Sequence, residues 1–152
     1  MDNTFHVFTD GSVIGNPGPG GWAAVLMSGD KKWEISGAMA STTISEMELL
    51  AAVEALRTIP TESRVQIHSD SELLIYGMLF HIERWRSHGW RNSRGVLLQN
   101  QGLWRQLLMM NGRMNIHWQW IRGHSGHPFQ TRADALAYQA ARTQGCGLQM
   151  AA

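Results

Sequence analysis

The sequence predicts an α/β domain built on a five-stranded mixed sheet, with the first three strands antiparallel and helices on both faces. Two observations carry this prediction. Three apolar stretches in the first forty residues are joined by short turns, which is typical of antiparallel strands. After Thr43 the apolar residues switch to helical spacing, and strands and helices then alternate, which favours parallel pairing. At 152 residues the chain is the size of one domain with one substantial core.

The first strand is expected at Thr4–Asp10, because large side chains alternate there on both faces. This pattern is typical of a central strand covered on both sides. A glycine- and proline-rich turn follows it, and Trp22–Met27 reads as the second strand. Gly29-Asp30 is a turn signal that predicts a hairpin into a third strand at Lys32–Met39.

A helix is expected to begin after Thr43, which is a suitable N-cap because Glu46 follows three residues later. Pro60 ends this helix, and Arg64–Ser69 is expected to be a strand parallel to the first. A helix is then expected at Glu72–Phe80, followed by a second, short helix that breaks at Gly89 and by an irregular connection to Asn100. The last expected elements are a helix at Leu103–Met110 that ends at Asn111-Gly112, a strand at Met114–Ile121, and a helix from Pro128 to about Arg142. We therefore assign residues 1–143 to the domain and residues 144–152 to a loose tail.

The net charge of +1 conceals a strong segregation of charge along the chain. Residues 1–83 carry four basic and eleven acidic side chains, whereas residues 84–133 carry eight arginines and no acid. The segregation favours a polyanionic partner over a helix face whose arginines are neutralised within the fold.

Nothing in the sequence suggests a membrane segment or an exported protein. No apolar run approaches the roughly 18–20 residues of a membrane span, and the first residues do not resemble a signal peptide. We therefore expect no membrane partner and a cytoplasmic location. Cys146 is the only cysteine, which rules out an internal disulfide and any zinc site built from several cysteines.

Four carboxylates are expected at strand ends or on helices that can meet. Asp10 and Asp70 follow adjacent parallel strands, Glu48 lies in the first turn of a helix, and Asp134 lies in the last helix. Taken singly, Asp10 could be a turn aspartate and Glu48 a solvated helix residue.

Two ionised carboxylates about 4 Å apart repel by roughly 4 kcal/mol at an effective dielectric constant near 20, so a cluster of carboxylates needs bound protons or cations. All-oxygen ligands suit Mg²⁺ or Mn²⁺, and a pair of such ions is suited to phosphodiester hydrolysis.

Six motifs resemble those of the bacterial type 1 ribonuclease H family. They are Phe-Thr-Asp-Gly-Ser at 8–12, Gly-Asn-Pro-Gly-Pro-Gly-Gly at 15–21, Met-Glu-Leu at 47–49, Ser-Asp-Ser at 69–71, Gly-His-Ser-Gly-His-Pro at 123–128 and Asp-Ala-Leu-Ala at 134–137. Each motif alone is weak, but six in order over residues 4–142 are highly specific. The resemblance implies a ribonuclease H-like fold and a monomeric endonuclease. Its expected reaction is hydrolysis of the RNA strand of RNA–DNA hybrids, leaving 5′-phosphate and 3′-hydroxyl ends.

The resemblance also implies roles for the site residues. Asp10, Glu48, Asp70 and Asp134 would bind two Mg²⁺ ions, with Mn²⁺ as a possible substitute. Asp10 would bridge both ions, Asp134 would help hold the ion that activates water, and Glu48 and Asp70 would hold the ion at the leaving 3′-oxygen. His124 matches a histidine that assists proton transfer or product departure, and its glycine-flanked loop agrees with such a role. A weak zinc site at His124 and His127 is the alternative.

Residues 81–100 match the family's basic protrusion, which grips the DNA strand. In this segment, arginines are expected to contact the nucleic-acid backbone, namely Arg84, Arg86, Arg91 and Arg94. Trp85 and Trp104 are expected to contact a DNA sugar, and Gly11 and Ser12 to contact RNA 2′-hydroxyls. Asn16 and Thr43 are expected near a DNA phosphate, and Glu72 near the site. For the tryptophans, core packing is the competing interpretation. Gly11 is also expected to let the RNA backbone approach the metals.

Several positions depart from the commonest bacterial pattern, but none removes an expected metal ligand. Ile44 and Ser45 replace two asparagines, Glu72 replaces a glutamine, His81 replaces a tryptophan, and Phe129-Gln130-Thr131 replaces a more polar run. Two other functions stay open at this point. One is a hybrid-binding module that does not cut, and the other is a DNA-acting nuclease of the same fold.

Overall fold

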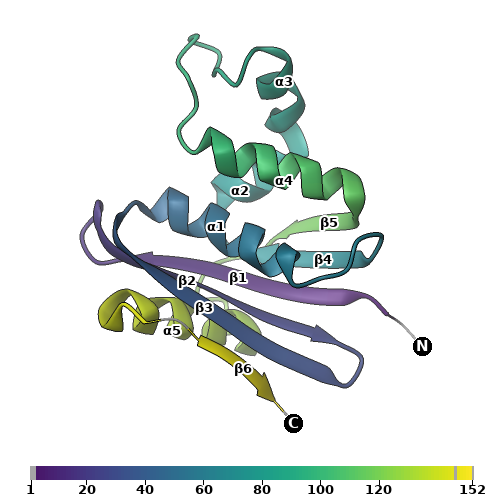
Figure 1. Cartoon of the computed structure of the whole chain (residues 1–152), viewed down its shortest axis with the longest axis vertical. Coiled ribbons are helices and arrows are strands. Elements are labelled where there is room, and N and C mark those ends of the chain that lie inside the picture. The colour runs from purple at the N-terminus through teal and green to yellow at the C-terminus, as the bar shows by residue number, and fades with distance from the viewer. Residues whose placement is uncertain (1–2, 146, 152) are drawn as a thin grey trace.

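In the computed structural model, which describes residues 3–145 and 147–151, a twisted sheet lies between helices on its two faces (Figure 1). The strands are β1 (Phe5–Val13), β2 (Gly18–Ser28), β3 (Lys31–Thr42), β4 (Arg64–Ser69), β5 (Asn115–Trp120) and β6 (Gly147–Ala151). The helices are α1 (Ile44–Arg57), α2 (Glu72–Tyr76), the π-helical η1 (Gly77–His81), α3 (Ile82–Ser87), α4 (Gln101–Arg113) and α5 (Pro128–Thr143). None of the described helices is both long and apolar enough to cross a bilayer.

The expected five-stranded mixed sheet is confirmed, in the order β3-β2-β1-β4-β5. β1, β2 and β3 are antiparallel, whereas β4 pairs parallel to β1 and to β5. Because Phe8 lies opposite His68 in the β1–β4 register, Asp10 and Asp70 reach the same level at the edge of the sheet. The topology thus brings two of the four carboxylates together.

β6 adds a sixth strand, antiparallel to the outer edge of β3. The expectation of a loose tail over residues 144–152 is therefore wrong for Gly147–Ala151. The unpaired backbone groups along an edge strand can bind a further strand of suitable length. Cys146 and Ala152, which also belong to the expected tail, lie outside the described residues.

The glycine-rich stretch after Asp10 is also more regular than expected. β1 does not end at Asp10 but continues to Val13, and Ser12 pairs with Gly21 of β2. Asn16 lies in the short turn between these strands, and its side-chain oxygen accepts a hydrogen bond from the Ile44 amide at 3.2 Å. The turn is therefore tied to the start of α1.

The core lies mainly between α1 and the sheet, and α5 covers the opposite face (Figure 1). Apolar side chains at helical spacing in α1 are completely buried, including Leu49, Val53 and Leu56. The Thr43 side chain accepts a hydrogen bond from the Glu46 amide at 3.2 Å, which confirms the N-cap. This cap fixes the first turn of α1, which carries Glu48.

Candidate active site

Asp10 is the most buried of the four carboxylates, with 6% of its surface exposed. Its Oδ1 accepts a hydrogen bond from the Gly11 amide at 2.9 Å. The pKa of Asp10 is raised to about 8, chiefly by burial and next by the charge of Asp70. Asp134 raises it as well, whereas the hydrogen bond from the Gly11 amide lowers it. Without a cation, Asp10 therefore holds a proton at neutral pH.

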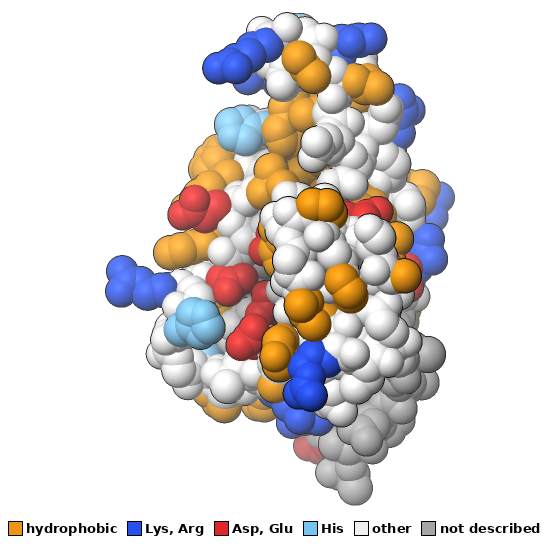
Figure 2. All heavy atoms as spheres, turned by 90° about the vertical axis from the view of Figure 1, so that its left-hand side faces the viewer, with side chains coloured by type: hydrophobic (Ala, Val, Ile, Leu, Met, Phe, Trp, Pro, Cys, Tyr) orange, Lys and Arg blue, Asp and Glu red, His pale blue; other side chains and the backbone are white. Residues whose placement is uncertain are grey.

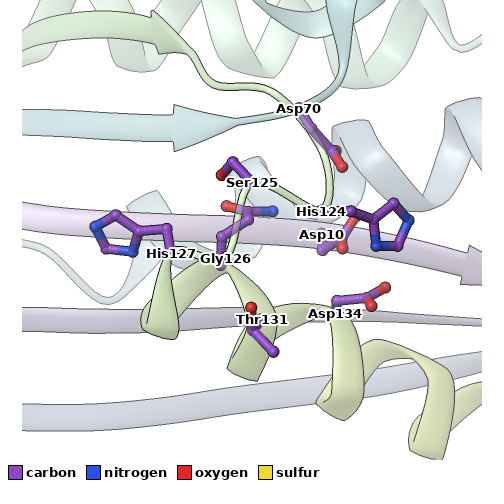
Figure 3. Close-up of a pocket in the computed structure, with 9 residues that line it drawn as sticks. Asp10, Asp70, His124, Ser125, Gly126, His127, Thr131 and Asp134 are labelled. Atoms are coloured by element: carbon purple, nitrogen blue, oxygen red, sulfur yellow. The ribbon is translucent and has the colours of Figure 1, made fainter.

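Asp70 and Asp134 complete a group of three carboxyls on the side of the sheet that α5 covers (Figure 3). Asp70 follows β4, and burial and the charge of Asp134 raise its pKa, while His124 opposes the shift. The backbone oxygen of Asp70 accepts a hydrogen bond from the Trp120 indole at 3.2 Å, which fixes the turn after the strand. Asp134 projects from α5 toward the other two.

Glu48 approaches the group from α1, on the other face of the sheet. Burial raises its pKa, a hydrogen bond from Ser71 lowers it, and the charge of Asp70 raises it. α1 comes this close because Gly11 has no side chain. A Cβ at Gly11 would lie 2.9 Å from the Glu48 amide nitrogen. Gly11 therefore admits α1, which is a reason for this glycine that the sequence analysis did not give. The approach of the RNA backbone at Gly11 stays a prediction.

The loop before α5 places one histidine toward the carboxyls and turns the other away (Figure 3). His124 has a left-handed backbone, with φ of 57°, and its ring lies beside Asp10 and Asp134. His127 instead caps α5, accepting a hydrogen bond from the Phe129 amide at 3.3 Å, and its ring stacks on Phe8 at 4.7 Å. The two histidines thus do not converge as zinc ligands.

A small cavity of about 50 Å³ lies among the three aspartates and this loop. No lysine or arginine of the described chain contributes to the pKa shifts of Asp10, Glu48 or Asp70, and His124 acts on Asp70 alone of these three. The described side chains therefore do not fully neutralise the ionised carboxyls. Divalent cations with a preference for oxygen would do so. Among the described residues, no three His, Cys, Asp or Glu side chains are already arranged around one metal position. The donor set therefore fits Mg²⁺ or Mn²⁺, and the carboxyl groups must turn toward an ion when it binds.

A sequence model of the RNase H family matches residues 2–142. The chain belongs to the RNase H family. Ribonuclease HI of Caulobacter vibrioides is 42% identical over 136 residues, covering 90% of this chain and 91% of that protein. Ribonuclease H of Rhizobium meliloti is 45% identical over 132 residues, covering 87% and 86%. The chain is therefore an enzyme of the RNase H type, as its motifs predict.

Solved RNase H structures share the fold. LC9-RNase H1, described as a type 1 RNase H with the type 2 active-site motif, superposes with a TM-score of 0.88 at 28% identity, covering 99% of this chain and 79% of that one. LC11-RNase H1 in complex with RNA/DNA hybrid superposes with a TM-score of 0.65 at 20% identity, covering 91% and 97%. At that lower identity the likeness shows the fold alone.

Of the nucleic-acid contacts expected by analogy with the RNase H family, Trp104 is the one that the structure contradicts. It is 2% exposed and packs edge-on against Trp85, with ring centroids 5.0 Å apart. Gly77 lies directly against the Trp104 ring, because any Cβ there would overlap it. Trp104 is therefore a core residue, as the competing interpretation held. Trp85 is 9% exposed, so it offers at most one edge to a ligand.

Gly11 is buried in β1, whereas the remaining expected contacts lie on the surface or near it. Asn16 and Thr43 meet at the start of α1, where both already bind backbone amides, and Ser12 is partly exposed in β1. Glu72 is exposed at the first residue of α2. The four arginines of the basic segment, Arg84, Arg86, Arg91 and Arg94, are partly or fully exposed. Their contacts with nucleic acid remain predictions.

Gln130 is a site residue of this RNase H-family chain that the sequence analysis missed. It is 4% exposed and lines the aspartate cavity, and its Nε2 donates to the Thr9 carbonyl oxygen at 3.1 Å. Thr9 immediately precedes Asp10, so this bond fixes α5 to the strand that carries the central carboxyl. A glutamine two residues after the helix-starting Pro128 gave no signal, because its burial depends on how α5 docks.

Proposed function

We propose that this chain is an endonuclease that hydrolyses the RNA strand of RNA–DNA hybrids with two divalent metal ions, leaving 5′-phosphate and 3′-hydroxyl ends. The observation that carries the proposal is the meeting of Asp10, Asp70 and Asp134 with Glu48 at one edge of the sheet, where no described lysine or arginine contributes to the pKa shifts of Asp10, Glu48 or Asp70. A protein that only binds a hybrid has no use for carboxyls that repel one another. The relatives named ribonuclease H support the same activity.

Asp10, Glu48, Asp70 and Asp134 would hold the two ions, with Mg²⁺ as the natural metal and Mn²⁺ as a substitute. When bound, such ions supply Lewis-acid stabilisation of the phosphate and a more acidic water. Asp10 lies centrally, because both Asp70 and Asp134 act on its pKa. Its position agrees with a role as the shared ligand.

His124 is proposed to carry a proton to or from the phosphate. Its ring lies next to the carboxyls, and it acts on Asp70 electrostatically. His124 and Gly126 both have a left-handed backbone, and the loop that carries them belongs to no helix or strand. The ring is therefore held toward the site by a loop. This arrangement is suited to a group that must approach the substrate and then withdraw.

The arginines of residues 84–133 are proposed to bind the phosphates of the duplex. This stretch contains eight arginines and no acidic residue. The relatives named ribonuclease H support an RNA–DNA hybrid as the duplex. We further propose that the protein acts as a cytoplasmic monomer.

The decisive experiment incubates the protein with Mg²⁺ and a labelled RNA–DNA hybrid, double-stranded RNA or double-stranded DNA. We expect cleavage of the hybrid alone, and none by Asp10→Asn. Analysis of the product ends by phosphatase and ligase treatment checks the 5′-phosphate and 3′-hydroxyl. Binding of the hybrid without cleavage in Mg²⁺ or Mn²⁺ would favour the non-cutting module, and cleavage of double-stranded DNA would favour the DNA-acting nuclease.

A further inference from the structure

The sheet face on which α5 lies is only partly covered. α5 packs against β1, β2 and β3, whereas β4 and β5 lie beyond it at the other edge of the sheet (Figure 1). Val65, Ile67 and Trp118 are buried on the opposite face, in the core. Because side chains alternate along a strand, the intervening residues of β4 and β5 face away from the core, and all of them are partly or fully exposed. We call this surface the open face; it consists of Arg64, Gln66, His68, Asn115, His117 and Gln119.

The open face carries hydrogen-bond donors and flat rings, and none of its six side chains is acidic. Arg64 lies opposite Asn115 in the β4–β5 register, and Gln66 lies opposite His117. Guanidinium, amide and imidazole groups can all donate hydrogen bonds to the oxygens of a ligand. With no carboxylate among them to accept these bonds, the open face suits a ligand that is negatively charged and rich in acceptors.

A pocket of about 300 Å³ lies at the amino end of the open face. The Arg64 side chain has no hydrogen bond or ion pair within residues 3–145 and 147–151. Glu62 is the acid closest to Arg64 along the chain, and it does not line the pocket. A guanidinium surrounded by amide donors matches the oxygens of a phosphate group. The residues that line the pocket are Thr4, Arg64, Val65, Gln66, Asn115 and His117.

A row of stacked rings connects the open face to the aspartate cavity. His127 lines that cavity, and its ring lies 4.7 Å from the Phe8 ring. The other neighbour of Phe8 is His68 of the open face, at 4.4 Å with the two planes only 7° apart. β4 runs from Arg64 to Ser69, immediately before Asp70, so the pocket and the carboxyls are about 20 Å apart at roughly 3.3 Å per residue. They lie at opposite ends of one continuous surface.

A single nucleic-acid strand has the chemistry that this surface requires. Its phosphates can bind Arg64 and the amide groups, and its unpaired bases can stack on histidine rings. Under the proposed function the carboxyls act on the RNA strand, so a strand that continues from them onto the open face is RNA. An acidic peptide would also suit Arg64, but nothing would lead it there from the carboxyls.

We infer that single-stranded RNA extending beyond the hybrid lies along the open face, with one of its phosphates in the pocket at Arg64. This inference rests on the proposed function. It adds a second binding surface, separate from the arginines of residues 84–133. The enzyme should therefore bind a hybrid more tightly when the RNA strand continues as a single strand.

The test measures the Kd of fluorescent RNA–DNA hybrids in an Asp10→Asn background with Mg²⁺, so that the RNA stays intact. The hybrids share one duplex and are blunt or carry an eight-nucleotide RNA overhang at either the 5′ or the 3′ end. Eight stacked nucleotides, at about 3.4 Å each, are long enough to reach the pocket. One of the two overhangs should lower Kd about fivefold or more.

Three variants of the open face should reduce this gain. Arg64→Gln removes the charge in the pocket, Asn115→Asp adds an opposing charge, and His117→Ala removes a ring. In Arg64→Gln and Asn115→Asp the gain should fall below twofold, and His117→Ala should retain part of it. The slope of log Kd against log salt should fall by about 0.7 in Arg64→Gln for the overhang hybrid alone. None of the three should change the Kd of the blunt hybrid.

Arg142→Gln is the matched control, because it removes the same charge from an exposed position in the last turn of α5. It should leave the gain intact, and an equal loss in Arg142→Gln and Arg64→Gln would overturn the pocket as the site. An equal gain from an overhang of the DNA strand would overturn the choice of RNA. If neither RNA overhang lowers Kd, while the wild-type chain cleaves the blunt hybrid, this inference alone is wrong. A wild-type chain that neither binds nor cleaves hybrids overturns the proposed function as well.

Discussion

Asp10 combines burial with two neighbouring acids, and its pKa of about 8 has a consequence for stability. Between its ordinary value of 3.8 and about 8 the folded chain binds a proton that the unfolded chain has released. The free energy of unfolding of the metal-free protein should therefore fall as pH rises through this window, by up to about 1.4 kcal/mol per pH unit.

Asp10→Asn removes that dependence. In EDTA the variant should be more stable than the wild type at pH 8, and the difference should shrink toward pH 4, as measured by urea unfolding. Mg²⁺ should stabilise the wild type at pH 8 more than it stabilises Asp10→Asn. Equal pH profiles for the two proteins would show that Asp10 is already ionised in the folded chain.

Gln130 joins α5 to β1 with one amide group, and its Oε1 has no hydrogen-bond partner among the described residues. Gln130→Glu replaces the donor to Thr9 with an acceptor and adds charge beside Asp10. We expect it to lower the free energy of unfolding at pH 7 by about 1–3 kcal/mol. The loss should be smaller at pH 4, where a protonated carboxyl can donate. Gln130→Met, which adds no charge, is the control that separates the lost hydrogen bond from the added repulsion.

At the scale of elements, α5 lies directly on β2 because Gly21 has no side chain. A Cβ at Gly21 would overlap the Ala137 carbonyl oxygen and lie 2.5 Å from the Ala141 nitrogen. Gly21→Ala should therefore push α5 outward and move Asp134 with it. We expect a loss of about 1–3 kcal/mol in the free energy of unfolding and a fall in kcat of at least about tenfold.

Gly102→Ala is the matched change in a helix that has room for a methyl group, because nothing lies within 4 Å of its Cβ position. It should leave activity intact and be neutral or stabilising by up to about 1 kcal/mol. Full activity in Gly21→Ala would show that the position of Asp134 tolerates movement of α5.

The elements show what local patterns can and cannot predict. Alternation around Val7 and helical spacing around Val53 predicted the sheet and α1, because burial on one face imposes those periods. Asp10 and Asp70 were correctly placed at adjacent strands for the same reason. The pairing of β6 with β3 and the burial of Trp104 against Gly77 depend on contacts between distant segments, which no local period records.

For the whole molecule, the segregation of charge predicts how binding of a duplex depends on salt. Each phosphate that an arginine neutralises should add about 0.9 to the slope of log Kd against log salt. Within the described part of the chain, Arg86 pairs with Glu83 at 2.9 Å and Arg91 donates to the Gly95 carbonyl oxygen at 3.0 Å, whereas Arg84 and Arg94 have no side-chain hydrogen bond or ion pair. Arg84 and Arg94 are therefore the arginines best able to bind phosphate without breaking an existing contact.

Arg94→Gln should weaken hybrid binding and reduce the salt slope by about 0.9, and Arg84→Gln should do the same. The loss should be independent of the base sequence, because phosphate contacts carry no sequence information. Arg57→Gln is the control of equal charge, since Arg57 lies at the end of α1 and pairs with Glu54 at 3.3 Å. If all three variants reduce the slope equally, then the basic segment attracts the duplex only through net charge, and a direct contact at Arg84 or Arg94 is excluded.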